Sequence, residues 1–197
     1  RYASRDLTNL SQSHIVNDIR RLYEPNWTRR GMWNQSYYEA RVPKVPTMLL
    51  ELLSHQNFAD MRYGLDPRFR FTVSRAIYKG MLQFLANQYK QDYVVQPLPV
   101  DHMSARFTKD TEVELTWQPV DDPLEPTAKA EQYIVYTRIG EGDFDNGILV
   151  NKNSYQTNIP SGVICSYKVT AVNKGGESFP SEILSVGKAI QTKGTVL

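Results

Sequence analysis

The sequence predicts two domains of different fold class, an α/β domain over residues 1–95 and an all-β sandwich over residues 100–190. Two observations predict this division. Before residue 96 apolar residues recur mostly every three or four positions, whereas after residue 99 they alternate with polar ones; these are the periods of helices and of half-buried strands. The segment 96–99 reads Gln-Pro-Leu-Pro, and we expect a stiff linker there. Residues 191–197 are expected to form a tail.

Two long helices are expected in the first domain. The first covers residues 1–24 and ends at Pro25, because proline cannot continue a helix. Asp18 should face solvent on this helix. The second begins at Pro67 and continues to about Tyr89. Its spacing predicts one face packed on a core, formed by Val73, Ala76, Ile77, Gly80, Met81, Phe84 and Leu85.

Residues 48–50, Met-Leu-Leu, form an apolar run that predicts a strand buried on both faces. Pro43 and Pro46 keep the approach extended. We expect an inner strand of a three-layer α/β domain, covered by the second long helix. Glu51 would lie where this strand surfaces among leucines, and burial there raises the pKa of a carboxyl group unless a cation or metal lies opposite. A loop with a short helix is expected over residues 54–66.

Alternation of apolar and polar residues predicts strands over residues 112–117, 133–136 and 166–173. Turn signals rich in glycine, asparagine and proline separate these strands. Short strands at such spacing are typical of a seven-stranded, immunoglobulin-like sandwich.

Composition narrows the classes of partner. The chain has 197 residues, 41% hydrophobic and 22% charged, which is ordinary for a globular protein. Its net charge of +2 is too small to predict a nucleic-acid partner. No apolar run approaches the roughly 20 residues of a membrane span. Cys165 is the single cysteine, so neither an internal disulfide nor a cysteine metal site is expected. Because the chain begins at Arg1, we expect a mature product or a fragment.

The second domain carries a specific set of residues over about residues 98–188. The set comprises Trp117, then Tyr167-x-Val169-x-Ala171-x-Asn173, and then Gly175-Gly176. It resembles the core tryptophan, the penultimate strand and the following turn of a fibronectin type III domain. The resemblance implies that Tyr167 forms a tyrosine corner, with a buried ring and a hydroxyl bonded to the upstream backbone. The fold alone implies no chemistry.

An ordered set of short motifs runs through the first domain. It comprises Arg30-Gly31, Val45-Pro46-Thr47-Met48-Leu49-Leu50-Glu51, Asn57, Asp60, Asp66-Pro67 and Ala76-Ile77-Tyr78-Lys79-Gly80-Met81. In this order and spacing the first domain is similar to the C-terminal half of the zinc-dependent N-acetylmuramoyl-L-alanine amidases that cut peptidoglycan. The sequence departs from the family at Leu53, which stands where the family usually has glycine.

The resemblance implies that Glu51 is the catalytic carboxylate of a parent cell-wall hydrolase. In the family, zinc is held by histidine, glutamate and histidine ligands that precede the matched region. We therefore expect the N-terminal half of the amidase-like domain, with the metal, upstream of Arg1, and neither zinc binding nor hydrolysis by this chain alone. The implied partner is peptidoglycan or another cell-wall glycan, and the implied location is the periplasm, the cell envelope or outside the cell.

Two alternatives stay open. His14 and His55 are the histidines that would join Glu51 if a metal site existed within this chain. The chain can also belong to a non-catalytic envelope protein that binds glycan or another protein through an amidase-like scaffold. The aromatic residues Trp33, Tyr37 and Tyr38 either pack in a core or stack on a sugar or peptide.

Overall fold

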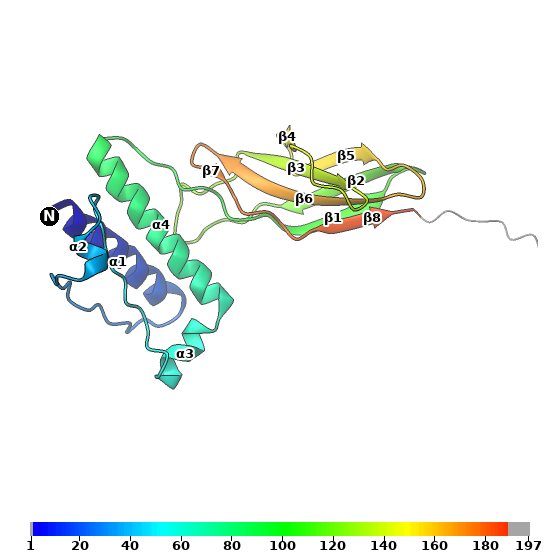
Figure 1. Ribbon diagram of the computed structural model, residues 1–197. Helices are drawn as coiled ribbons and strands as arrows, with labels where there is room; N and C mark the ends of the chain where they lie inside the picture. The colour runs from blue at the N-terminus through cyan, green and yellow to red at the C-terminus, as the bar shows by residue number, and fades with distance from the viewer. Residues whose placement is uncertain (1, 189–197) are drawn as a thin grey trace, which may run out of the picture. The chain divides into compact units, whose positions relative to one another are not determined.

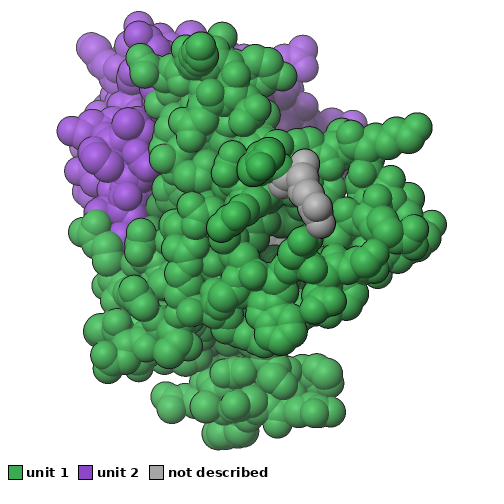
Figure 2. Space-filling model, turned by 90° about the vertical axis from the view of Figure 1, so that its left-hand side faces the viewer, with its two compact units in different colours: residues 1–93 green, residues 94–197 purple. Residues whose placement is uncertain are grey.

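The computed structural model describes residues 2–188. The chain divides into two compact units, residues 1–93 (unit 1) and residues 94–197 (unit 2), which are coloured separately in Figure 2. The expected tail over residues 191–197 lies outside the described residues.

Unit 1 is built on two long helices that pack against each other, α1 (Tyr2–Leu22) and α4 (Pro67–Tyr89) (Figure 1). Both confirm the predicted long helices, but Met81 and Leu85, which were predicted on the core face of α4, are 48% and 46% exposed. Their shared core consists of Ile15, Ile19, Phe69, Val73 and Ala76. Glycine is required at Gly80, because a Cβ there would lie 2.6 Å from the Cα of Ser11. No helix in residues 2–188 has the length and apolar character needed to cross a membrane.

Two short helices follow α1 in the sequence, α2 (Tyr38–Arg41) and α3 (Phe58–Gly64). The side chain of Asn57 caps α3 by accepting hydrogen bonds from the N–H groups of Ala59 and Asp60. Asp66 caps α4 by accepting a hydrogen bond from the N–H of Arg68. This hydrogen bond lowers the pKa of the Asp66 carboxyl group. The expected short helix within residues 54–66 is therefore present.

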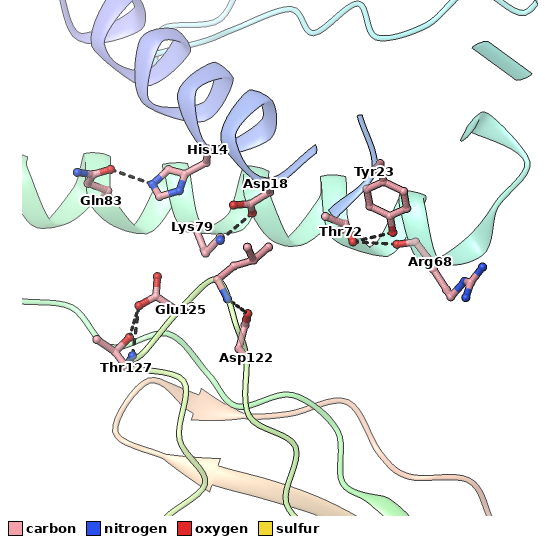
Figure 3. Close-up of polar contacts among 11 residues, drawn as sticks. His14, Asp18, Tyr23, Arg68, Thr72, Lys79, Gln83, Asp122, Glu125 and Thr127 are labelled. Carbon is pink, nitrogen blue, oxygen red and sulfur yellow. Dashed lines mark hydrogen bonds and ion pairs between the residues drawn. The ribbon is translucent and has the colours of Figure 1, made fainter. Parts of the chain in front are cut away.

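Three polar pairs join α1 and the residue after it to α4 (Figure 3). His14 contacts Gln83 at 2.9 Å, and the hydroxyls of Tyr23 and Thr72 lie 3.2 Å apart. Lys79 Nζ lies 2.7 Å from an oxygen of Asp18, and the two side chains are only 2% and 8% exposed. The prediction that Asp18 faces solvent is wrong, because its carboxylate is the partner of a buried ammonium group.

The predicted strand over residues 48–50 is not formed, and the described part of unit 1 contains helices and irregular segments only. Residues 46–54 form no regular secondary structure, with Leu49 46% and Leu50 39% exposed. An extended segment becomes a strand only when a neighbouring strand accepts its backbone hydrogen bonds. Residues 2–93 offer none, so the three-layer α/β arrangement expected for this domain is not seen.

Unit 2 is a sandwich of two antiparallel sheets (Figure 1). The smaller sheet has the order β1 (Asp101–Phe107), β2 (Glu112–Gln118), β5 (Ser154–Asn158). In the larger sheet β3 and β6 are central, and the members are β4 (Ile148–Val150), β3 (Gln132–Ile139), β6 (Ile164–Asn173), β7 (Gly176–Glu177) and β8 (Leu184–Gly187). Strands β2, β3 and β6 confirm the three predicted from alternation. Because β7 and β8 both pair with β6, they occupy one edge position, and the described residues fill seven strand positions.

The core of unit 2 lies between the sheets around Trp117, which is 1% exposed and meets Tyr133 edge to face. Tyr167 is equally buried, which confirms the predicted burial of its ring, and this burial raises the pKa of its hydroxyl. Its expected bond to the upstream backbone stays a prediction.

The segment that enters unit 2 is held by unit 2 itself. Val95 is fully buried; its N–H donates to the hydroxyl of Thr127, and its carbonyl accepts from Asn173. A Cβ on Gly175 would lie 2.2 Å from the carbonyl oxygen of Val94, so only glycine fits there. The compact units thus meet in sequence between Tyr93 and Val94.

Candidate functional site

A hollow of about 1470 Å³ opens in unit 1. Three parts of the chain line it: the first turns of α1, the loop over residues 30–37 and the extended segment over residues 43–51. Its lining is mixed, with apolar side chains, three cations (Arg5, Arg30 and Lys44) and the single carboxylate of Glu51.

The segment over residues 47–54 is held at both ends. The N–H of Thr47 donates to the hydroxyl of Ser4 at 3.1 Å, and the N–H of Ser54 donates to Asp60 at 2.8 Å. Near the second end, Leu52 and Leu53 pack on the core between α1 and α4. Within the described residues, the backbone groups of residues 48–51 form no hydrogen bond. The backbone groups of residues 48–51 are therefore not paired with another strand within the described residues.

Glu51 lies at the hollow, in the last part of this segment. Its side chain is exposed. The expectation that Glu51 is desolvated at the end of a buried strand is not met in this chain, because the strand that would bury it is not formed.

Leu53 has a left-handed backbone, with φ of 68°. This conformation is unfavourable for residues with a Cβ and is the usual place of glycine. Leu53 is thus one of the non-glycine residues with positive φ in the described part of the chain.

Aromatic side chains gather on the loop over residues 30–37 and at the start of α2, beside the hollow. Trp33 is 70% and Tyr38 67% exposed, so these rings do not pack in the core. The guanidinium of Arg30 lies 5.8 Å from the Trp33 ring centre. The loop is tied to α1 through Arg29, whose guanidinium donates to Asn9, Gln12 and Ser13. Rings held in this way are available for stacking on a ligand.

The histidines do not come together with Glu51. His14 is engaged by Gln83, and His55 is exposed. Across residues 2–188 no three or more histidine, cysteine, aspartate or glutamate side chains form a group able to hold a metal ion. Cys165 is buried in β6.

A second cluster of chemical interest, in unit 2, was missed from the sequence. Arg138 and Lys168 both lie over the ring of Phe144 on the outer face of the larger sheet. The alternation of β3 and β6 already places Arg138 and Lys168 on the face opposite to the buried Val135 and Tyr167. The signal for Phe144 was absent, since it lies in a loop.

No protein-family model matches the chain, and no curated protein matches it. Solved structures match about half of it. The twitchin kinase region from C. elegans is 20% identical over 48% of this chain and 17% of that chain, with a TM-score of 0.42. The structure of titin kinase and its flanking domains is 21% identical over 48% of this chain and 18% of that chain, also with a TM-score of 0.42. A human fibronectin type III domain is 19% identical over 51% of this chain and 85% of that chain, with a TM-score of 0.43.

The chain spans less than a fifth of the twitchin and titin chains that it matches. By its own strand order and its core around Trp117 and Tyr167, unit 2 is a fibronectin type III-like sandwich.

Proposed function

We propose that this chain is part of a cell-wall hydrolase and that unit 1 is the C-terminal half of an N-acetylmuramoyl-L-alanine amidase-like domain. The bond cut in the parent protein joins the lactyl group of muramic acid to the first L-alanine of the stem peptide. Unit 2 is an accessory domain, and the protein works in the periplasm, in the cell envelope or outside the cell.

The observation that carries this proposal is the ordered set of motifs, and the backbone at Leu53 is compatible with it. The motifs from Arg30 to Met81 match the family in order, and the left-handed φ of Leu53 falls at the family's glycine. Asn57 and Asp66, two further residues of the set, cap α3 and α4.

Glu51 has the role of proton-transferring carboxylate in this proposal. A carboxylate that accepts the proton of an attacking water, and then delivers it to the leaving amine, typically contributes about 10²–10⁴-fold in rate. The family implies zinc, but the described residues do not form a ligand set for it. The proposal therefore assigns to this chain only the role of Glu51, and it assigns the metal to the N-terminal half of the domain.

A second function, binding of cell-wall glycan without catalysis, is favoured by one observation. Trp33 and Tyr38 are exposed beside the hollow rather than packed in a core. Aromatic faces of this kind present a large apolar surface with little conformational freedom to lose.

The deciding experiment uses the parent protein that contains both halves of the domain. Its Glu51→Gln variant keeps the size of the side chain but cannot accept a proton. We expect release of stem peptides from purified peptidoglycan to fall by about 10²–10⁴-fold, with folding and bound zinc unchanged. The matched control is Glu39→Gln, which neutralises another exposed carboxylate and should leave the rate unchanged.

Two outcomes contradict the hydrolase. If Glu51→Gln turns over at the normal rate, Glu51 is not the proton carrier. If the unaltered parent releases no stem peptide but sediments with peptidoglycan, and Trp33→Ala abolishes this binding, the non-catalytic function is correct.

A further inference from the structure

The loop over residues 140–147, which joins β3 to β4, contains the one asparagine of the chain that a glycine follows, Asn146-Gly147. Asn146 is exposed and lies outside regular secondary structure. Among the described residues its carboxamide group forms no hydrogen bond. The side chain is therefore open to water and free to turn toward the following peptide group.

An asparagine that precedes glycine is chemically reactive in water without any enzyme. The backbone nitrogen of the glycine gives up its proton and attacks the Cγ atom of the asparagine. The bond between these two atoms forms, the bond from Cγ to the side-chain nitrogen breaks, and ammonia leaves with the proton. Water then opens the resulting succinimide ring at one of its carbonyl groups, which yields aspartate or isoaspartate. Glycine permits this ring closure best, because it has no Cβ and the fewest backbone restrictions.

The fold requires glycine at position 147. Its φ of 76° lies in the left-handed region, which residues with a Cβ rarely adopt. A Cβ there would also overlap the side chains of Ile134 and Tyr136 on β3. The residue that makes Asn146 reactive is therefore fixed by the structure of the loop.

Asp145 occupies the N–H group that the reaction needs. One oxygen of its carboxylate accepts hydrogen bonds from the N–H of Gly147 at 3.0 Å and from the N–H of Thr137 at 2.9 Å. The N–H of Asp145 in turn donates to the carbonyl of Thr137 at 2.9 Å, so Asp145 is held against β3 by its main chain and its side chain.

This hydrogen bond opposes the first step of the reaction. Loss of the proton from Gly147 removes a charge-assisted hydrogen bond, which is stronger than a neutral one. It also leaves a negative nitrogen beside the carboxylate of Asp145, and like charges at this distance repel each other. The nitrogen of Gly147 is thus a poorer nucleophile in the folded chain than in an unfolded one.

We propose that Asn146 is a site of spontaneous deamidation and that Asp145 slows the reaction in the folded chain by holding the N–H of Gly147. Asp145 is a positioning residue in this inference, since it acts through the peptide group of its neighbour. The inference goes beyond the proposed hydrolase, because it involves neither Glu51 nor the N-terminal half of the amidase-like domain.

The modification has a structural consequence at the edge of the larger sheet. Isoaspartate carries the side-chain methylene of residue 146 within the main chain, two residues before β4 begins at Ile148. β4 pairs with β3 alone among the described strands, over three residues. An added backbone atom so close to this short pairing should loosen it, and the amides of β4 should then exchange faster with solvent.

The test follows conversion of Asn146 by peptide mapping and mass spectrometry, in the whole 197-residue chain at mildly alkaline pH. We expect slow conversion in the folded chain and faster conversion in urea, where the hydrogen bond is absent. Asp145→Ala should speed up conversion in the folded chain about tenfold, since a hydrogen bond to a charged acceptor typically contributes about one decade. Asp145→Asn, which keeps a neutral acceptor, should lie between the two. Amide hydrogen exchange at Gly147 removes the same proton and should rise in the same order.

The matched control is Asp143→Ala, which removes another exposed carboxylate of the same loop and should leave the rate unchanged. If hydrogen exchange shows that Asp145→Ala unpairs β4, Asp145→Asn alone is compared with the unaltered chain. Conversion as fast in the folded chain as in urea would overturn the proposal. Unchanged rates in both Asp145 variants, or equal acceleration by Asp143→Ala, would overturn it as well.

Discussion

At the scale of single residues, Leu53 is a residue with a Cβ that is held in a backbone conformation usually occupied by glycine. Its φ of 68° lies in the left-handed region, and its side chain packs on the core of unit 1. A residue with a Cβ pays roughly 1–2 kcal/mol in this region relative to the right-handed one. Packing of the leucine side chain offsets that cost.

This reasoning predicts an unusual order of stability at position 53. Leu53→Ala and Leu53→Gly both lose the packed side chain, but alanine also keeps the strain. We expect Leu53→Gly to be more stable than Leu53→Ala by about 0.5–1 kcal/mol, after the extra chain entropy of glycine is subtracted. Urea unfolding followed by circular dichroism measures the difference.

The neighbouring position supplies the control. Leu52 packs on the same core, and it is not among the described residues with positive φ. There the usual order should hold, with Leu52→Ala more stable than Leu52→Gly. If alanine is the better residue at both positions, the backbone at Leu53 is not strained.

Several single-residue features were predictable because their causes are local. The start of α4 follows from Asp66 and Pro67, which cap and begin a helix wherever they occur together. The environment of Glu51 was not predictable in this way, because burial of a carboxylate depends on distant strands. The side chain of Glu51 is exposed instead of buried.

At the scale of elements, strands predicted in unit 2 formed, whereas the strand predicted over residues 48–50 did not, because a strand depends on distant partners. Alternation over β2, β3 and β6 predicted real strands, since each has paired neighbours within the chain. The run Met-Leu-Leu predicted a strand from composition alone, and no strand of unit 1 exists to pair with it among the described residues. The predicted exposure of Asp18 on α1 was wrong for a different reason. A charged residue is usually exposed, and no local pattern indicated that the ammonium group of Lys79 lies beside it.

The ion pair between α1 and α4 carries the prediction that belongs to this scale. Asp18→Ala would leave the buried ammonium of Lys79 without its counter-charge. Breaking a buried pair on one side typically costs about 3–5 kcal/mol, whereas replacing both partners by apolar residues is often neutral. We therefore expect Asp18→Ala to destabilise unit 1 strongly and Asp18→Leu/Lys79→Met to restore most of the loss, as measured by urea unfolding.

An exposed pair gives the comparison. Arg106 and Glu114 lie 2.6 Å apart, but the arginine side chain is 75% exposed. Arg106→Ala should cost less than about 1 kcal/mol. A cost for Asp18→Ala as small as this would mean that Lys79 finds another partner or water, and the buried pair would then not hold the two helices together.

At the scale of the whole molecule, the two units have separate cores of unequal size. The core of unit 2 contains eleven buried residues around Trp117, whereas the core between α1 and α4 contains five. Stability rises with the apolar surface that folding removes from water. Unit 1 also keeps the unpaired extended segment and the hollow, which the proposed N-terminal half of its domain would complete.

The chain should therefore unfold in two steps, unit 1 before unit 2. Its three tryptophans separate the steps, because Trp27 packs on the core of unit 1, Trp33 lies on the adjoining loop and Trp117 is buried in unit 2. In Trp117→Phe the fluorescence reports unit 1 alone, and in Trp27→Phe/Trp33→Phe it reports unit 2 alone. We expect the first variant to show a lower midpoint in urea, since the smaller core loses its stability sooner.

Addition of the N-terminal half of the amidase-like domain should raise the unit 1 midpoint and leave that of unit 2 unchanged, because a partner stabilises only the state it binds. Coincident midpoints in the two variants would show one cooperative unit instead of two.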